Sequence, residues 1–241
     1  AAAVGVKYII ENPLASLRIN IKGTENVFEA ANRHKRKVML ASTSEIYGKN
    51  EKDNLSENDD RILGSTSISR WGYSCAKAVD EFFALAYWRE KKLPVVTVRF
   101  FNTCGPRQTG EYGMVIPRFV KAALLGRPLL VYGDGKQIRC FSFVGDVIEG
   151  LLALAEHPQA EGDIFNLGST EPITIEELAQ KIVKMTKSAS SIQYIPYEQA
   201  YERGFEDLRK RVPDISKAKK LVGFEPKTSL EQLLQKVIEY F

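Results

Sequence analysis

Hydrophobic residues recur along the chain at two different spacings. Between residues 14 and 34 they follow the spacing of a helix, and Pro13 lies at its expected first turn, where a missing N–H is tolerated. Two short apolar runs, 37–41 and 94–100, have the composition of buried strands, and the helical segment between them ends near Lys91. This alternation predicts βαβ units with right-handed crossovers, and therefore a parallel sheet.

The segment between these two strands begins with a polar stretch. Residues 49–69 are rich in Asp, Asn and Ser, which predicts a surface loop. In the helix that follows, the apolar residues that we expect to face inward are Val79, Phe82, Phe83, Leu85 and Ala86.

Beyond Arg107 the elements become shorter and their order less regular. Thr174 and Glu177 have the spacing of a capping box at the start of one helix. We expect helices at residues 114–125, 144–155, 174–187, 214–222 and 228–240, and strands or extended segments at 129–132, 138–143, 163–167 and 191–195.

Composition narrows the class of protein. The net charge of +4 is small and forms no basic stripe, which argues against a nucleic-acid partner. No apolar run approaches the roughly 20 residues of a membrane span, and no secretory leader is visible at the start. The cysteines lack a C-x-x-C spacing, as expected in a reducing compartment without a disulfide framework or zinc site: Cys75, Cys104 and Cys140. We therefore expect a cytoplasmic protein that binds neither membrane nor metal.

Tyr73 and Lys77 are the strongest candidates for chemistry. Four residues apart on a helix, they lie on the same face. A free tyrosine has a pKa of ~10, and a fixed cation beside it favours the phenolate. The pair can therefore move a proton on and off a hydroxyl group. The alternative is an ordinary solvated helix face, on which Tyr and Lys are common.

Polar residues follow both predicted strands. Ser42 to Gly48 includes hydroxyls and one carboxylate, and Asn102 to Arg107 includes a Gly-Pro turn. Ligands bind at the carboxyl ends of strands in open parallel sheets, so both clusters are candidate site segments. The alternative for the first cluster is a capping loop, because Ser and Thr are ordinary turn residues.

Taken together, the motifs identify a family. The chain resembles the extended short-chain dehydrogenase/reductases, and among them the NAD-dependent nucleotide-sugar epimerases and dehydratases. The resemblance covers the whole chain and rests on Ala2-Ala3, Asn20-x-x-Gly23-Thr24, the hydroxyl cluster ending Tyr47-Gly48, Tyr73-x-x-x-Lys77, Asn102-x-x-Gly105-Pro106-Arg107, Gln137-x-Arg139-x-Phe141 and Arg211-x-Pro213-Asp214.

The resemblance implies an α/β fold with a Rossmann-like parallel sheet and a smaller C-terminal α/β domain. Residues 1–107 would form the later part of the NAD-binding domain with the catalytic residues. Residues 108–241 would mainly bind the nucleotide sugar, with some segments returning to the first domain. The glycine-rich strand–turn–helix that holds the NAD pyrophosphate in this family is not in the chain. We therefore expect the N-terminal half of the Rossmann domain to be missing here, and NAD binding to depend on it.

The resemblance also implies roles for individual residues. Tyr73 would take the proton of the sugar C4 hydroxyl, Lys77 would hold the cofactor ribose, and Thr43 would bond the same sugar oxygen. Asn20 would support the site. The cofactor side would comprise Ala2, Ala3, Tyr73, Lys77 and Phe100. The substrate side would comprise Asn102, Arg107, Gln137, Arg139 and Arg211, although Arg139 could equally be a surface arginine.

The step after C4 oxidation separates the candidate reactions. A dehydratase needs an Asp-Glu pair after the threonine, whereas this chain has Ser44-Glu45, which counts against dehydration. Thr43-Ser44-Glu45 and Arg211 are similar to UDP-glucuronate decarboxylases, in which Arg211 would meet a carboxylate or diphosphate and Glu45 would repel a carboxylate or relay a proton. The alternatives are that Glu45 caps a turn and that Arg211 binds only phosphate.

Three hypotheses remain open. The first is a UDP-glucuronate decarboxylase-like enzyme, and the second is a UDP-hexose 4-epimerase. The third is an inactive fragment that only binds a nucleotide sugar or a partner. Because family members commonly dimerise through the tyrosine-bearing helix, a homodimer is expected, and the residues suited either to that contact or to an internal core are Phe82, Phe83, Tyr87 and Trp88.

Overall fold

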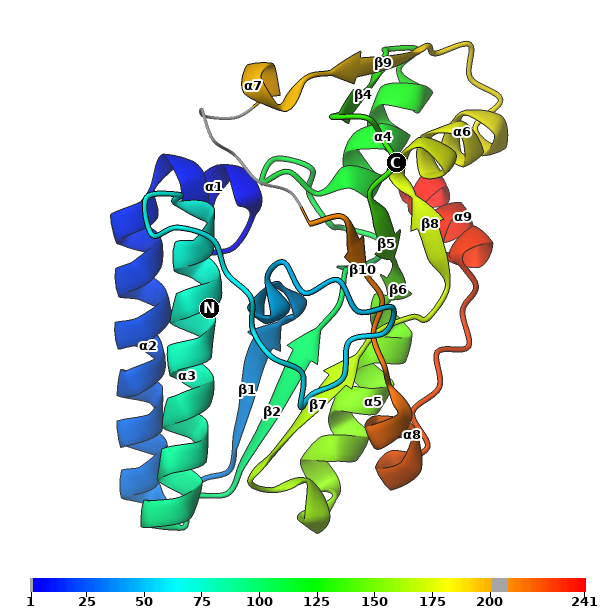
Figure 1. Ribbon diagram of the computed structural model, residues 1–241. Helices are drawn as coiled ribbons and strands as arrows, with labels where there is room; N and C mark the ends of the chain where they lie inside the picture. Colours follow the sequence, from blue (N-terminus) through cyan, green and yellow to red (C-terminus); the bar gives the residue numbers. More distant parts are fainter. Residues whose placement is uncertain (1, 201–207) are drawn as a thin grey trace.

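A three-stranded parallel sheet lies at the centre of the chain. The computed structural model describes residues 2–200 and 208–241 (Figure 1). Strands β1 (Val38–Thr43), β2 (Val95–Phe100) and β7 (Asp163–Leu167) pair in that order, all parallel. Thr43 is in register with Phe100, and Phe100 with Leu167, so the three carboxyl ends are level. The predicted parallel sheet is confirmed.

Helices cover both faces of this sheet. Helices α2 (Pro13–His34) and α3 (Arg70–Lys91) lie side by side on one face, and α5 (Val144–Glu156) and α8 (Ser216–Val222) cover the other (Figure 1). Burial from two sides explains why β2 reads as a continuous apolar run, since neither face of the strand meets water. Among the described residues, no helix is long and apolar enough to cross a membrane.

The outer surface of α2 and α3 differs from the prediction. Phe82 is 66 % exposed and Ala86 is also exposed, so the expectation that both face inward is wrong. The reason is helical geometry: they lie four residues apart on the side of α3 turned away from the sheet, whereas Ala84 is buried. A short helix that the sequence did not predict, α1 (Val6–Glu11), precedes α2.

The second half of the chain builds a smaller unit from three small sheets. Strand β4 (Leu129–Tyr132) pairs with β9 (Ile192–Ile195), and β3 (Thr103–Cys104) pairs with β6 (Ser142–Phe143). The third sheet has the order β10 (Lys210–Arg211), β5 (Ile138–Cys140), β8 (Pro172–Thr174). The predicted extended segment 138–143 is therefore two strands with different partners.

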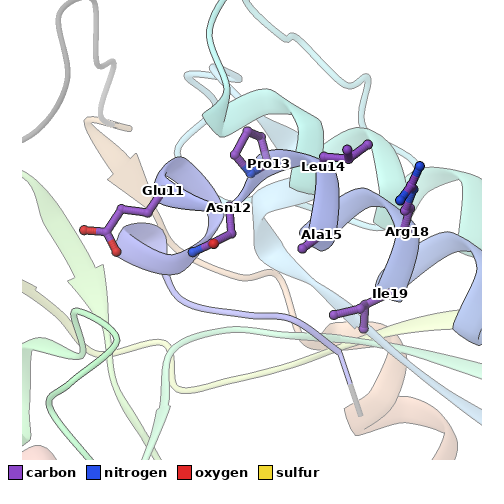
Figure 2. Close-up of a pocket in the computed structure, with 7 residues that line it drawn as sticks. All are labelled: Glu11, Asn12, Pro13, Leu14, Ala15, Arg18 and Ile19. Carbon is purple, nitrogen blue, oxygen red and sulfur yellow. The ribbon is translucent and has the colours of Figure 1, made fainter.

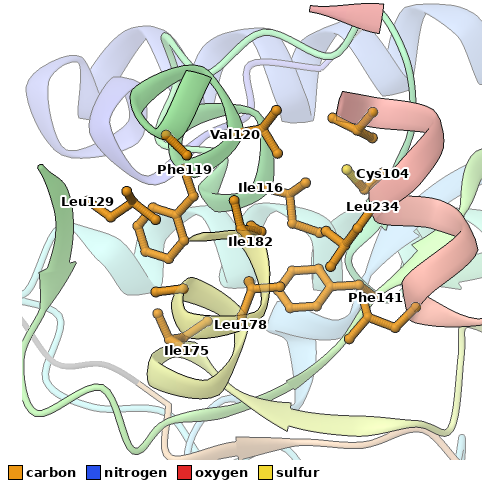
Figure 3. Packing of buried hydrophobic residues seen from close by; sticks show 14 of the residues in the cluster. Cys104, Ile116, Phe119, Val120, Leu129, Phe141, Ile175, Leu178, Ile182 and Leu234 are labelled. Atoms are coloured by element: carbon orange, nitrogen blue, oxygen red, sulfur yellow. The ribbon is translucent and has the colours of Figure 1, made fainter. Parts of the chain in front are cut away.

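Helices α4 (Val115–Leu124), α6 (Ile175–Met185) and α9 (Leu230–Tyr240) enclose the core of this unit (Figure 3). Phe119, Leu178 and Leu234 meet in it and are fully buried. The predicted capping box of α6 is confirmed, because Thr174 and Glu177 each accept a hydrogen bond from the other's backbone N–H. A further short helix, α7 (Tyr197–Ala200), follows β9.

The segment predicted as a surface loop enters the structure more deeply than expected. Leu55 is 1 % exposed. Its N–H donates to Val212 O at 2.8 Å, and Asp214 N–H donates to Leu55 O at 2.8 Å. The loop is thus joined to the chain on either side of Pro213, and this contact fixes the end of β10, which carries Arg211.

Candidate active site

Tyr73 and Lys77 lie in the first two turns of α3, beside the carboxyl end of β1. Tyr73 is 9 % exposed and Lys77 is 4 % exposed. Such burial excludes the alternative of a solvated helix face. A buried lysine needs a counterpart for its charge, and Asp80 supplies it: Lys77 Nζ lies 2.9 Å from Asp80 Oδ2.

Thr43 ends β1 and caps the short 3-10 helix η1 (Ser44–Tyr47). The backbone N–H of Glu45 donates to Thr43 Oγ1 at 3.2 Å. The Thr43 side chain also lies beside the Tyr73 phenol, where it opposes part of the rise in the phenol pKa that burial causes. The structure thus brings Thr43 and Glu45 to the tyrosine, while Ser44 Oγ accepts a hydrogen bond from Arg211 Nη1 at 3.3 Å.

Glu45 is surrounded by arginines from three elements. Arg211 Nη1 of β10 lies 2.6 Å from Glu45 Oε1, and Arg70 Nη2 of α3 lies 3.2 Å from Oε2. Arg139 of β5 is in register with Arg211 and adds its charge. Burial alone would raise the pKa of Glu45, but Arg211, Arg70 and Arg139 outweigh it and lower it to about 2. The side chain is an ion-pair partner here and does not cap a turn.

This arrangement predicts a pH-dependent contribution to stability. The pKa of Glu45 falls from 4.5 to about 2 on folding. A carboxyl group whose pKa is lowered by folding adds its full contribution to the free energy of unfolding above its unfolded-state pKa. This contribution is lost as the pH falls through the folded-state pKa. We expect the free energy of unfolding of wild type to exceed that of Glu45→Gln by about 2–3 kcal/mol at neutral pH, and the difference to vanish between about pH 4.5 and pH 2.

Urea unfolding over that pH range provides the measurement. Glu231→Gln, which removes an exposed carboxylate paired with Lys181, is a matched control with little expected effect. An unchanged difference between wild type and Glu45→Gln from neutral pH to pH about 2 would contradict the assigned ion pairs.

The charges around Tyr73 act against its ionisation. Burial and the carboxylates of Glu45 and Asp80 raise its pKa, outweighing the Thr43 hydrogen bond and the charge of Arg211. The phenol is therefore protonated at neutral pH in this structure. The lowering of the pKa by Lys77 stays a prediction.

Asn20 anchors the start of the chain. Its side-chain Oδ1 accepts from Ala3 N–H at 3.0 Å, and its Nδ2 donates to Ala3 O at 3.2 Å. Asn20 is 1 % exposed, Ala3 is buried and Ala2 is exposed. The role that the structure gives Asn20 is thus to fix Ala3 against α2 through the backbone.

The remaining predicted site residues lie on several elements. Phe100 is half-buried at the end of β2. Asn102 Nδ2 donates to Cys140 O at 3.1 Å, and Gln137 Nε2 donates to Tyr132 O at 3.0 Å. Arg107 is exposed in a left-handed backbone conformation with φ 69°. The structure brings Arg139 and Arg211 to Glu45 but does not bring Arg107 to it.

Sequence reasoning missed a buried polar network behind the site. Arg99 binds Glu81 through two hydrogen bonds of 2.9 and 2.7 Å, and it donates to Tyr47 Oη at 3.0 Å. Tyr47 Oη donates to Asn166 Oδ1 at 2.7 Å, and Ser42 Oγ donates to Glu81 at 2.5 Å. A charged residue inside the apolar run of β2 was the available signal, because a buried arginine needs a carboxylate partner. Arg70 and Asp80 were missed as well; Asp80 has the i,i+3 spacing of a helical ion pair with Lys77, whereas Arg70 has no such signal.

A hollow elsewhere on the surface does not coincide with this site. About 550 Å³ in volume, it lies where α1 meets α2 and is lined by residues 11–15, Arg18 and Ile19 (Figure 2). None of the residues predicted for the site lines it, so the site is defined by its converging side chains. In the part of the chain that the structure describes, no group of three or more His, Cys, Asp or Glu could hold a metal ion.

Comparison with known proteins agrees with this geometry. The family model described as GDP-mannose 4,6 dehydratase matches residues 1–237. The chain belongs to this family of nucleotide-sugar epimerases and dehydratases. The UDP-N-acetyl-alpha-D-glucosaminuronate decarboxylase of Bacillus cytotoxicus is 45 % identical over 100 % of this chain and 74 % of its own length.

Two further members of the family are informative. The UDP-glucuronic acid decarboxylase 1 of Danio rerio is 38 % identical, and the match covers 95 % of this chain but 53 % of that protein. The UDP-glucuronic acid 4-epimerase of Bacillus cereus, solved with UDP-glucuronic acid and NAD, superposes with a TM-score of 0.87 at 27 % identity, covering 100 % of this chain and 73 % of its own. The chain therefore spans between about half and three quarters of these relatives.

Proposed function

We propose that this chain is the catalytic and sugar-binding part of an NAD-dependent UDP-hexuronate decarboxylase that acts through a 4-keto intermediate. The observation that carries the proposal is the set of three arginines around Glu45, next to Tyr73 and Thr43. Guanidinium groups bind carboxylates and phosphates in bidentate fashion, and a UDP-hexuronate carries both. The relatives named as decarboxylases support this reading.

The residues present fit the nicotinamide end of NAD, which, when bound, would accept a hydride from C4. Among the described residues Asp80 is the one partner of the Lys77 ammonium, which leaves two of its three N–H groups for ribose hydroxyls. Tyr73 would take the proton of the C4 hydroxyl, and Thr43 would donate to the same oxygen as it becomes a carbonyl. The pyrophosphate would be held by a segment outside this chain.

The arginines would select a substrate whose 4-ketone can lose CO₂. With a carboxylate at C6, this ketone would be a β-keto acid, so the C5–C6 bond would break with loss of CO₂ and its electron pair would enter the enolate at C4. C5 would then take a proton, and C4 would regain its hydride. Arg211, bound to Glu45 in this structure, would exchange that partner for the substrate carboxylate or diphosphate.

The test uses the full-length protein with NAD⁺ and, in separate reactions, UDP-glucuronate, UDP-N-acetylglucosaminuronate and UDP-glucose. Release of CO₂ and formation of a UDP-pentose or its N-acetylamino analogue would support the proposal and identify the sugar. Interconversion of C4 epimers without CO₂ would favour the 4-epimerase, the activity named for the Bacillus cereus structure. Binding of UDP without turnover of any sugar would favour an inactive binding protein.

The proposal includes a division of the chain and a location. Residues 1–107 would complete the NAD-binding domain, and residues 108–241 would bind the nucleotide sugar, with β7, α5 and α8 returning to the central sheet. Three unpaired cysteines are consistent with a cytoplasmic enzyme.

We further propose that α2 and α3 form the contact of a homodimer. On their outer surface Phe82 is 66 % and Val27 is 56 % exposed, and Gly23 has open space around it. Replacing Phe82 by Glu should convert a dimer into a monomer, as sedimentation velocity would show, because a charge would be buried in a self-complementary interface. Leu152→Glu, on the exposed side of α5, is the matched control. A Phe82→Glu protein that remains dimeric would exclude this interface.

A further inference from the structure

Asp80 is a buried carboxylate that no step of the proposed reaction uses. It is fully buried on α3, and its Oδ2 lies 2.9 Å from Lys77 Nζ, whose side chain is 5 % exposed. The other oxygen, Oδ1, has no hydrogen-bond partner among the described residues. Burial raises the pKa of Asp80, and the opposing effects of Lys77 and of the Thr24 side chain on α2 do not cancel that rise.

Stability does not explain this ion pair. Removing two charges from water costs about as much as their attraction returns, and replacing a buried pair by apolar residues is often neutral or stabilising. The position of the pair points to a different role. Asp80 lies one helical turn beyond Lys77, which itself lies one turn beyond Tyr73, so the three ionisable groups follow one another along α3.

The charged groups that face Tyr73 come from three elements. Asp80 on α3 and Glu45 on η1 raise the pKa of Tyr73, and Arg211 on β10 lowers it. Lys77, paired with Asp80, lies one helical turn beyond Tyr73 on α3. The negative charge of Glu45 is offset by the arginines that it binds. Among the described residues, the cation that pairs with Asp80 is Lys77, the same cation that is expected to favour the phenolate. Asp80 therefore acts on Tyr73 both directly and by neutralising Lys77.

We propose that Asp80 is a positioning residue that holds the Lys77 ammonium by one N–H, weakens its field at Tyr73, and so keeps Tyr73 protonated in the resting protein. Two consequences follow. The remaining N–H groups of Lys77 are oriented away from Asp80 and are available to a ligand. A ligand that draws the ammonium from Asp80 would increase its influence on the phenol, so that the base forms when the site is filled. The inference rests on the proposed function of Tyr73 and Lys77.

The direct test measures the ionisation of Tyr73 in the full-length protein without cofactor. Difluorotyrosine at position 73 lowers the intrinsic phenol pKa into the range in which the protein stays folded, and its fluorine NMR shift reports ionisation. Asp80→Asn, which removes the charge and keeps the shape, should move this titration down by about one pH unit, equivalent to tenfold more phenolate at a given pH. Asp80→Ala should move it in the same direction and replaces the first variant if that one does not fold.

Glu161→Gln, which removes a carboxylate paired with Lys37, is the matched control and should leave the titration unchanged. In the active protein, the acid limb of the profile of kcat against pH should also move to lower pH in the Asp80 variants. An unchanged or upward shift of the phenol titration would overturn the proposal. Because the titration needs no turnover, absence of activity in wild type would refute the proposed function and leave this test intact.

Discussion

Replacing Tyr73 by Phe should lower the turnover of the full-length protein by about a thousandfold or more, which is the usual effect of removing a general acid–base group. The phenylalanine ring fills the same buried space, so the fold should persist. What disappears is the phenol oxygen beside Thr43 that would take the C4 proton. Steady-state kcat with the sugar that proves active is the measurement.

Tyr87→Phe is a suitable control for this prediction. Tyr87 lies four turns further along α3 and stacks on Phe28 with ring centroids 5.1 Å apart, remote from the carboxyl end of the sheet. It should retain wild-type turnover. A Tyr73→Phe protein with near wild-type kcat would mean that another group removes the proton.

Replacing Arg99 by Leu should produce the largest loss of stability, about 3–5 kcal/mol in the free energy of unfolding. Arg99 is 5 % exposed and binds Glu81 through two nitrogens, so its loss leaves a carboxylate buried without its cation. It also donates to Tyr47 Oη, which in turn holds Asn166. Urea unfolding monitored by circular dichroism gives the value.

Two further variants separate the effect of the charge from that of packing. Arg99→Leu combined with Glu81→Leu should recover much of the loss, because no unpaired charge remains. Lys181→Ala, which breaks an exposed pair with Glu231, should cost less than about 1 kcal/mol. If the double variant were no more stable than Arg99→Leu, the network would owe its contribution to shape and not to charge.

The central sheet and its helices could be predicted from the sequence because their signals are local. Strand β2 is a compact run of β-branched residues, and α6 begins at a capping box that the structure contains. The placement of Tyr73 and Lys77 on one side of α3 was predictable for the same reason, since residues four apart on a helix share a face whatever surrounds them.

The ion pairs of Glu45 and the burial of individual side chains could not be predicted, because they depend on contacts between distant parts of the chain. Arg211 reaches Glu45 only because β10 pairs with β5 on one side and Leu55 bonds to its flanking backbone on the other. No spacing reveals that a polar loop will contain a fully buried leucine. Phe82 was misplaced because an aromatic residue in a helix reads as core, whereas the surface on which it lies meets no other part of the described chain.

The most direct measurement follows the C4 hydrogen and the C6 carbon of one substrate together. The full-length protein would be mixed with UDP-hexuronate carrying deuterium at C4 and carbon-13 at C6, under single-turnover conditions. We expect transient formation of deuterated NADH, labelled CO₂, and a UDP-pentose product that regains the deuterium at C4, all absent in Tyr73→Phe. Labelled CO₂ without transfer of deuterium to the cofactor, or an intact hexuronate with no cofactor reduction, would contradict this expectation.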